Sequence, residues 1–277
     1  MVRIEPRYLD APGGRLFCLD VMPAGPARGY VFHLPAFAEE MNKSRRMVSL
    51  AARALADAGW HVFIVDPLGS GDSEGDFGDA SLASWVTDAA WCRQQLPAAD
   101  LPWVWWGLRS GALLASQASQ QAGGDALLLW QPVSAGKLFL TQFLRMRLAT
   151  ESLAGGGAAD TKPLRAMLDA GESLEVGGYM LSPAMARELE LAELKPAAGL
   201  PLCWLEISAR EEPELLPASR QRVDALRAAG HDVQASAHNG PMFWQSLEIS
   251  EVPALVDASV AALASLSLAE AVDGVVA

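Results

Sequence analysis

The amino-acid composition excludes several classes of protein. The chain has 277 residues, of which 51% are hydrophobic and 19% are charged, whereas an intrinsically disordered chain has little apolar content and much charge. Its 33 acidic and 21 basic residues give a formal net charge of −12. This charge argues against a nucleic-acid-binding protein, because phosphate neutralisation needs clustered Lys and Arg.

Cysteine usage and hydropathy indicate the cellular compartment of the protein. The three cysteines, Cys18, Cys92 and Cys203, are dispersed and odd in number, which fits neither a disulfide framework nor a zinc site and favours a reducing compartment. No secretory signal is visible in Met1–Leu16, and the longest apolar stretch, Ala126–Trp130, is too short to span a bilayer. We therefore predict a soluble, cytoplasmic protein with no membrane span, metal or cofactor.

Strand and helix patterns alternate along most of the chain. In order they predict a β-hairpin (Arg7–Leu9 and Leu16–Val21), a strand (Gly29–His33), a helix (Lys43–Ala58), a strand (His61–Val65), a helix (Leu82–Leu96), a strand (Trp103–Trp106), a helix (Gly111–Gln121) and a strand (Ala126–Trp130). Further along they predict a strand (Leu202–Ile207), a helix (Glu214–Ala229), a strand (Asp232–Ala235) and a helix from Val252 to about Leu268. This alternation predicts an α/β fold, with a mostly parallel sheet covered by helices on both faces.

The alternation stops between Ser134 and Pro196. Helical patterns follow one another there, at Gln142–Leu153, Lys162–Ala170 and Ser182–Leu191, with a flexible Gly155–Gly157 stretch between the first two. We expect residues 134–196 to form a lid inserted into a core made of residues 1–133 and 197–277. The tail Ala269–Ala277 is predicted to fray.

The first motif with chemical potential follows the Trp103–Trp106 strand. Gly107 and Gly111 flank a turn from strand into helix, which is the layout of the G-x-S-x-G nucleophile elbow of α/β-hydrolases. Alignment on the glycines puts Arg109 at the nucleophile position and Ser110 one place late. A frame centred on Ser110 would put Leu108 at a position that needs a small residue, so we prefer the frame centred on Arg109.

An arginine at such an elbow is physically awkward. The elbow residue has a strained backbone with positive φ, and it lies at a helix N-terminus, where the helix dipole favours anions over cations. A nearby carboxylate or an anionic ligand should therefore offset the charge of Arg109. A plain salt bridge to a core carboxylate, marking a lost active site, is an equally good interpretation.

Three further loops follow predicted strands. The Asp66–Gly75 loop carries a D-x-x-G-x-G-x-S pattern but lacks the Lys of a P-loop, so a scaffolding role is favoured over phosphate binding. The loop after His33 would supply a backbone N–H of an oxyanion hole at Phe37 or Ala38, with His33 itself structural.

The last of these loops supplies a candidate general base. His238 follows the predicted final strand, where α/β-hydrolases place their catalytic histidine. Glu211 and Glu212, in the loop after Leu202–Ile207, are candidate acids. The order nucleophile, acid, histidine is the order of that fold, although a lone loop histidine is more often an ordinary surface residue.

Together these stretches resemble an α/β-hydrolase over essentially the full chain. The sequence more particularly resembles the exosortase A system-associated hydrolases of type 2, on Trp106–Ala115, Leu129–Val133, Leu140–Arg145 with Arg147, Gly178–Leu181 and Pro241–Trp244. The resemblance implies a setting of bacterial exopolysaccharide synthesis and PEP-CTERM protein sorting. It also implies that an arginine at the elbow is usual in such proteins, which puts a serine-hydrolase mechanism in doubt.

The leading functional hypothesis is a hydrolase or acyltransferase acting on an ester or thioester. Ser110 would be the nucleophile, His238 the base, Glu211 or Glu212 the acid, and backbone N–H groups near Phe37 and Gly111 the oxyanion hole. The predicted lid has an apolar surface (Phe139, Phe143, Leu144 and Met146) that favours an acyl or lipid-linked substrate, although plain lid-to-core packing would explain it too.

The second hypothesis is a binding protein that keeps the pocket without the chemistry. Arg109 would then clamp a carboxylate or phosphate group, assisted by Arg145 and Arg147. A third possibility is an interaction subunit of the exopolysaccharide machinery.

Overall fold

The computed structural model describes residues 1–96, 101–153 and 160–266, so the predicted Gly155–Gly157 stretch and the tail Ala269–Ala277 lie outside the described residues. Eight strands form one sheet, whose spatial order is β1 (Arg3–Ala11), β2 (Gly14–Met22), β4 (Trp60–Val65), β3 (Gly29–Leu34), β5 (Trp103–Leu108), β6 (Ala126–Trp130), β9 (Leu202–Ser208) and β10 (Val233–Asn239). Strands β1 and β2 pair antiparallel, as do β2 and β4, and every other neighbouring pair in the sheet is parallel. The predicted, mostly parallel sheet is therefore confirmed.

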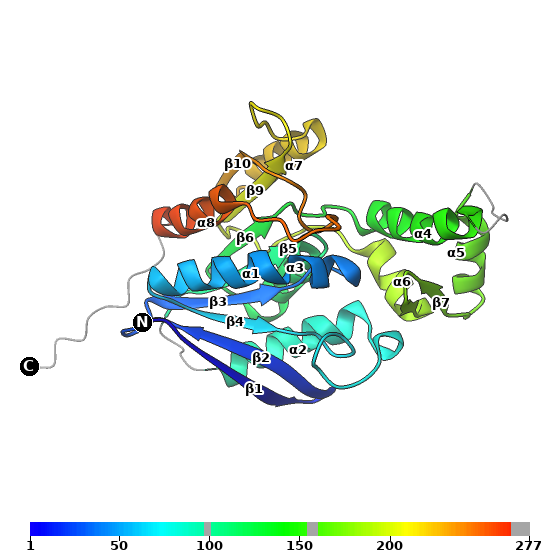
Figure 1. Cartoon of the computed structure of the whole chain (residues 1–277), viewed down its shortest axis with the longest axis horizontal. Helices are drawn as coiled ribbons and strands as arrows, with labels where there is room; N and C mark the ends of the chain where they lie inside the picture. Colours follow the sequence, from blue (N-terminus) through cyan, green and yellow to red (C-terminus); the bar gives the residue numbers. More distant parts are fainter. Residues whose placement is uncertain (97–100, 154–159, 267–277) are drawn as a thin grey trace, which may run out of the picture.

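Helices cover both faces of this sheet, as predicted (Figure 1). Buried side chains of α1 (Glu39–Asp57) and α8 (Pro253–Ser265) join one core cluster, and those of α2 (Leu82–Gln95), α3 (Gly111–Ala122) and α7 (Pro217–Ala228) join the other. Strand β5 contributes to both, because successive side chains point to opposite faces. Trp103 and Trp105 pack under α2 and α3, whereas Trp106 packs under α1.

The segment between β6 and β9 lies beside the sheet, on the right in Figure 1. It contains α4 (Gly136–Leu153), α5 (Lys162–Asp169), the antiparallel pair β7 (Leu174–Val176) and β8 (Tyr179–Leu181), and α6 (Pro183–Leu191). An isolated bridge between Ala135 and Glu193 brings its two ends together. The predicted helices are present, but the sequence pattern missed β7 and β8, as it missed the short 3-10 helix η1 (Phe77–Asp79).

Two element boundaries differ from the prediction in ways that matter for function. Helix α1 begins at Glu39 rather than Lys43, after Ala38 adopts a positive φ of 54°. Strand β10 continues to Asn239, so the prediction that His238 lies in the loop after the last strand is wrong. Parallel pairing with β9, in which His238 is opposite Ile207, extends the strand.

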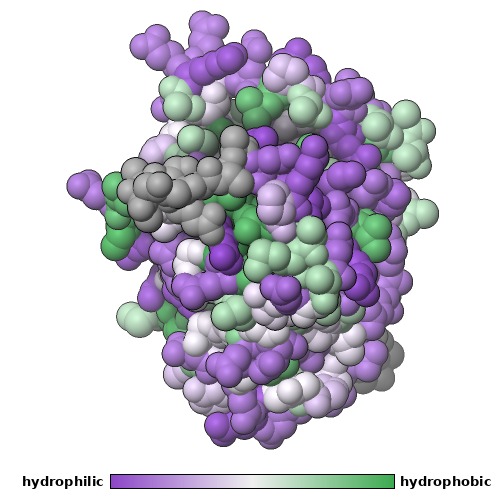
Figure 2. Space-filling view, turned by 90° about the vertical axis from the view of Figure 1, so that its right-hand side faces the viewer, coloured by the Kyte–Doolittle hydropathy of each residue, from purple (hydrophilic) through white to green (hydrophobic). Residues whose placement is uncertain are grey.

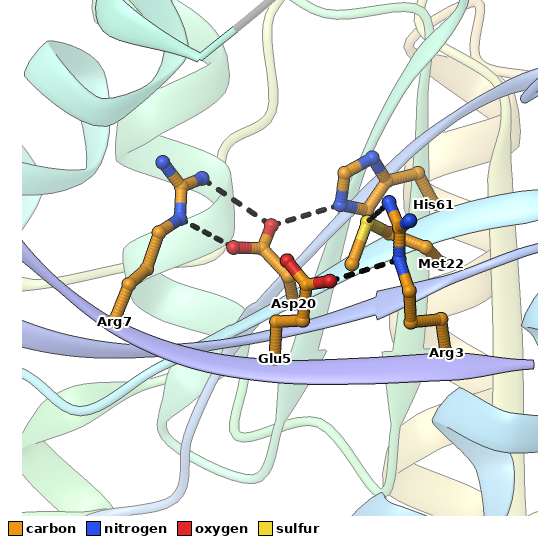
Figure 3. Close-up of polar contacts among 6 residues, drawn as sticks. All are labelled: Arg3, Glu5, Arg7, Asp20, Met22 and His61. Carbon is orange, nitrogen blue, oxygen red and sulfur yellow. Dashed lines mark hydrogen bonds and ion pairs between the residues drawn. The ribbon is translucent and has the colours of Figure 1, made fainter.

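An ion-pair cluster holds the antiparallel edge of the sheet together (Figure 3). Asp20 of β2 is buried and its carboxylate accepts hydrogen bonds from the guanidinium of Arg7 on β1. The same carboxylate lies 2.8 Å from Nε2 of His61, the second residue of β4. These contacts join three strands near the amino end of β4.

Within the described ranges, no helix combines the length and apolar character needed to cross a bilayer.

Candidate functional site

The turn between β5 and α3 places Arg109 in the strained position of the elbow. Arg109 has φ 56°, in the left-handed region, whereas Ser110 has helical angles of φ −64° and ψ −23°. Backbone hydrogen bonds fix the turn, because the N–H of Arg109 donates to Trp130 and its carbonyl accepts from Val133. The backbone strain therefore falls on the arginine.

The two flanking glycines are required by close packing. A Cβ on Gly107 would lie 2.7 Å from the backbone of Ala112, and one on Gly111 would lie 2.1 Å from the carbonyl oxygen of Leu34. The start of α3 is thus pressed against the loop that follows β3. This contact brings the N-termini of α1 and α3 to the same edge of the sheet.

The side chain of Arg109 pairs with Glu40 in the first turn of α1. Nε lies 3.2 Å from Oε2 and 3.4 Å from Oε1, and Nη2 lies 3.3 Å from Oε1. The guanidinium also lies over the Trp244 ring, with Cζ 5.3 Å from the centroid. The expected carboxylate that offsets the arginine is therefore Glu40.

Burial shapes the ionisation of this pair. Desolvation raises the pKa of the Glu40 carboxyl, and the Arg109 charge and hydrogen bonds from Arg109 and Gln245 lower it by less, so this pKa lies above its ordinary value. The positive end of the α1 dipole favours a carboxylate at this position, whereas it disfavours the guanidinium.

Arg109 and Glu40 open onto a cavity of about 510 Å³. Its polar walls are Glu39, Glu40, Lys43, Arg109, Gln142 and Gln245, and its apolar walls are Phe37, Phe139, Phe143, Met146 and Trp244. Helix α4 supplies four of these lining residues. Seen from the end of the molecule where α4 to α6 lie, the surface is mostly hydrophilic with hydrophobic patches near its centre (Figure 2).

Backbone strain gathers at this edge of the sheet. Among the described residues, three non-glycine residues have positive φ: Ala38, Arg109 and Gln131, at 54°, 56° and 42°. They follow β3, β5 and β6, three adjacent strands. In open α/β sheets, ligands bind at the carboxyl ends of the strands where the strand order reverses, and strained residues cluster at functional sites. The cavity lies at the carboxyl ends of β3 and β5, where the strand order reverses, and its lining includes the strained residue Arg109.

The structure does not bring the residues of the predicted serine-hydrolase triad together. Ser110 is 4% exposed and does not line the cavity. His238 lies in β10, where its Nε2 is 2.8 Å from Oγ of Ser236, and burial lowers its pKa. Glu211 and Glu212 are exposed beyond the end of β9. Within the described residues, no hydrogen bond or ion pair joins any two of these four side chains.

The remaining predicted site residues are divided. The Phe37 ring lines the cavity, and its edge packs against Phe139 and Phe143, with centroids 5.8 and 5.1 Å away. Gly111 begins α3, and the next two N–H groups of the helix donate to the carbonyls of Arg109 and Ser110. Arg145 is exposed on α4 and does not line the cavity. Phe139, Phe143 and Met146 do line it, whereas Leu144 is buried in the core.

The Asp66 loop is built as a scaffold. Both oxygens of Asp66 pair with the guanidinium of Arg45, at 3.1 and 3.0 Å, and Oδ2 accepts from the Asp72 N–H. A Cβ on Gly71 would lie 2.0 Å from that carboxylate. His33 is buried against Trp106, and desolvation lowers its pKa to about 3, so it is neutral.

Sequence analysis did not identify Glu40, Lys43 and Trp244 as cavity residues. The need for a carboxylate near Arg109 was visible, but its position depended on α1 starting at Glu39. Trp244 stands in the Pro241–Trp244 stretch, which contributed to the family resemblance. The residues that the structure describes contain no group of three or more His, Cys, Asp or Glu side chains placed to hold a metal ion.

Comparison with known proteins gives structural matches only. No family model matches the sequence, and no curated protein matches it. Est1E of Butyrivibrio proteoclasticus, with ferulic acid bound, has a TM-score of 0.64 at 15% identity, over 93% of this chain and 98% of its own. A lipase in its open form has a TM-score of 0.60 at 18% identity, over 94% and 97%.

A third similar structure is an α/β serine hydrolase of Xanthomonas campestris that is described as lacking a lid. It has a TM-score of 0.56 at 16% identity, over 95% of this chain and 94% of its own. The chain has the α/β-hydrolase fold. At these identities the likeness establishes the fold alone, and the reaction has to be argued from the site.

Proposed function

We propose that this α/β-hydrolase-fold protein binds a small amphipathic anion in the elbow cavity rather than cleaving an ester there. The guanidinium of Arg109, held at the position where this fold presents a nucleophile, carries the proposal. A carboxylate or phosphate head would bind beside Arg109 and Lys43, and an apolar body would lie over Phe37, Phe139 and Phe143.

The charges around the cavity support an anionic head. The lining side chains carry two positive charges, Arg109 and Lys43, and two carboxylates, Glu39 and Glu40. The N-termini of α1 and α3 add partial positive charge at the same edge. Burial raises the pKa of Glu40, so a ligand anion neutralises this carboxyl more easily than it would an exposed one.

A carboxylate with an apolar chain is the simplest probe. We expect titration calorimetry to show that decanoate binds the protein more tightly than 1-decanol, which has the chain without the charge. Arg109→Gln should remove this preference and weaken decanoate binding by roughly 10- to 100-fold, the contribution of hydrogen bonds to a charged group. Ferulate is a second probe, because the fold neighbour Est1E is known with ferulic acid bound.

A surface arginine provides the matched control. Arg220 of α7 forms an exposed ion pair with Glu214, which precedes that helix, at 3.4 Å. Neither residue lines the elbow cavity. Arg220→Gln removes one positive charge and one ion pair, as Arg109→Gln does, and should leave decanoate affinity unchanged. Equal affinity in the Arg109→Gln protein and the wild type would overturn the proposal.

Acyl hydrolysis is the second candidate function. The fold shared with a lipase and with serine hydrolases favours it, as does the glycine-flanked elbow. Ser110 would attack an ester or thioester, with His238 as base and Glu211 or Glu212 as acid, after a rearrangement that moves Ser110 out of its buried helical position. A fluorophosphonate probe that labels the wild type but not Ser110→Ala would support this candidate, and absence of labelling would support the binding proposal.

The biological setting rests on the family resemblance. It supports a cytoplasmic protein of an exosortase and exopolysaccharide system, whose ligand is acyl or lipid-linked and whose partner belongs to that machinery. Affinity purification of the tagged chain from a bacterium with such a system should recover components encoded beside it. Recovery of no such component would remove the interaction-subunit hypothesis.

A further inference from the structure

Glu40 already occupies the part of Arg109 that a ligand would use. Its two carboxylate oxygens face Nε and Nη2 of the guanidinium, the edge that binds a carboxylate with two parallel hydrogen bonds. Both side chains line the cavity, and both are partly accessible, at 14% for Arg109 and 19% for Glu40. Glu40 thus presents to Arg109 the same chemical group as a bound carboxylate ligand.

The contacts between Arg109 and Glu40 are longer than those of the Arg45–Asp66 pair. Its nitrogen–oxygen distances are 3.2 to 3.4 Å, whereas charge-assisted hydrogen bonds are commonly about 2.7 to 2.9 Å. The Arg45–Asp66 pair, which holds the loop after β4, has two contacts of 3.1 and 3.0 Å. A loosely bound carboxylate beside an open cavity is one that another carboxylate can replace.

The charged and titratable groups around Glu40 come from few elements. Arg109 faces it from the elbow, and Gln245 donates a hydrogen bond to it from the loop after β10. On its own helix, Lys43 lies close enough to lower its pKa. The other carboxylate, Glu39, is bonded instead to Asn42 and to Tyr179 of β8, and α4 adds Gln142 to the lining.

We propose that Glu40 determines the specificity of the cavity as a built-in competitor for the acid group of the ligand. This inference rests on the anion-binding function proposed above. A ligand carboxylate replaces the Glu40 carboxylate on Arg109, and Glu40 takes up a proton from solvent, so the number of negative charges beside the guanidinium stays the same. Only ligands whose acid reaches Arg109 while their apolar part fills the cavity compete successfully.

Two measurements on decanoate binding test this exchange. Wild-type affinity should be about tenfold tighter at about pH 5.5 than at pH 8, both above the usual range of carboxylic acids, because Glu40 is more easily protonated at the lower pH. Glu40→Gln should remove the pH dependence and bind decanoate about tenfold more tightly than wild type at pH 8.

Glu39→Gln is the matched control. Glu39 is the adjacent carboxylate in the same turn and the same cavity lining, but it does not bond to Arg109. Its replacement removes the same charge, and the pH dependence of decanoate binding should persist.

A measurement on the unaltered protein guards against variants that fail to fold. Calorimetric titrations of wild type in buffers of different ionisation enthalpy should show net proton uptake on decanoate binding. No uptake, or weaker binding by Glu40→Gln than by wild type, would show that Glu40 positions Arg109 rather than competing with the ligand. Anion binding itself would then stand or fall on Arg109→Gln alone, so the two proposals fail separately.

Discussion

Two arginine–carboxylate pairs lie at opposite ends of the sheet and differ in their partners and in their access to a cavity. At the amino end of β4, Asp20 is buried and is shared between Arg7 and His61, with His61 at 2.8 Å (Figure 3). Past the carboxyl end of β5, Glu40 meets Arg109 at 3.2 Å or more, beside a cavity. The first pair joins three strands, and the second rests on a strained turn.

The difference separates structure from function within one fold. A buried carboxylate whose two oxygens both pair with its own chain is not available to a ligand, and removing it leaves Arg7 and His61 without their counter-charge. A carboxylate with long contacts and access to a cavity costs little to release. Substitution at the amino end should therefore change the stability of the protein, and substitution at the elbow should change ligand binding.

The largest effect is expected at the amino end. Asp20→Asn should lower the free energy of unfolding by about 3 kcal/mol, because it removes the charge of a buried carboxylate that pairs with both Arg7 and His61. The Arg7 side chain is 41% exposed, which keeps the loss at the lower end of the range for a buried ion pair. Urea denaturation measures the loss, and decanoate binding by the folded variant should stay unchanged. Asp10→Asn, an exposed carboxylate on the same hairpin, should change stability by less than about 0.5 kcal/mol. A loss of stability below about 1 kcal/mol for Asp20→Asn would contradict a structural role for the Asp20 cluster that the elbow pair lacks.

A buried carboxyl with one unpartnered oxygen extends the comparison. Asp88 on α2 is buried beneath the hairpin turn, its Oδ2 has no hydrogen-bond partner, and burial raises its pKa from 3.8 to about 6. Below pH 3.8 it is protonated in both states. As the pH rises toward 6 the unfolded chain ionises first, so the contribution of Asp88 to the free energy of unfolding falls by about 2 to 3 kcal/mol.

Asp88→Asn should remove this contribution from the stability profile. The change in the free energy of unfolding from pH 4 to pH 7 should be about 2 to 3 kcal/mol more favourable in the variant than in wild type. Comparing the two pH values within each protein removes the constant cost of the unpaired amide. Parallel profiles for the two proteins would mean that Asp88 ionises in the folded state as freely as in the unfolded chain.

The smallest effect on stability is expected at the elbow. The double variant Arg109→Gly with Glu40→Gln removes both charges together and places glycine where φ is 56°, which relieves roughly 1 kcal/mol of backbone strain. Thermal unfolding should give a stability within about 1 kcal/mol of wild type, while the preference for decanoate over decanol disappears. A loss comparable with that of Asp20→Asn would assign the elbow pair a structural role.

Sequence patterns predicted the sheet well because its central strands β3, β5 and β6 are buried on both faces. The run Ala126–Trp130 is apolar throughout, and its boundaries matched those of β6. The short strands β7 and β8, of three residues each, carry no such run, so the pattern could not reveal them. The polar end of β10 was likewise assigned to a loop, because pairing with β9 rather than hydrophobicity extends it to Asn239.

The site was predictable to the extent that local geometry forms it. The glycine spacing alone placed Arg109 in the turn, and physical reasoning required a compensating charge. The identity of that charge depended on tertiary packing, since Glu40 is 69 positions away in sequence and reaches Arg109 through the contact between Gly111 and the loop after β3. His238 was chosen from its order along the chain, and that order does not fix which way a side chain points.

The walls of the cavity come from four widely separated stretches of the chain, at 37–43, 109, 139–146 and 244–245. In a nascent chain the cavity is incomplete until Trp244 and Gln245 have been synthesised. Early folding intermediates therefore lack the complete binding site. Ligand binding therefore acts on the finished protein, where it should slow unfolding rather than accelerate folding.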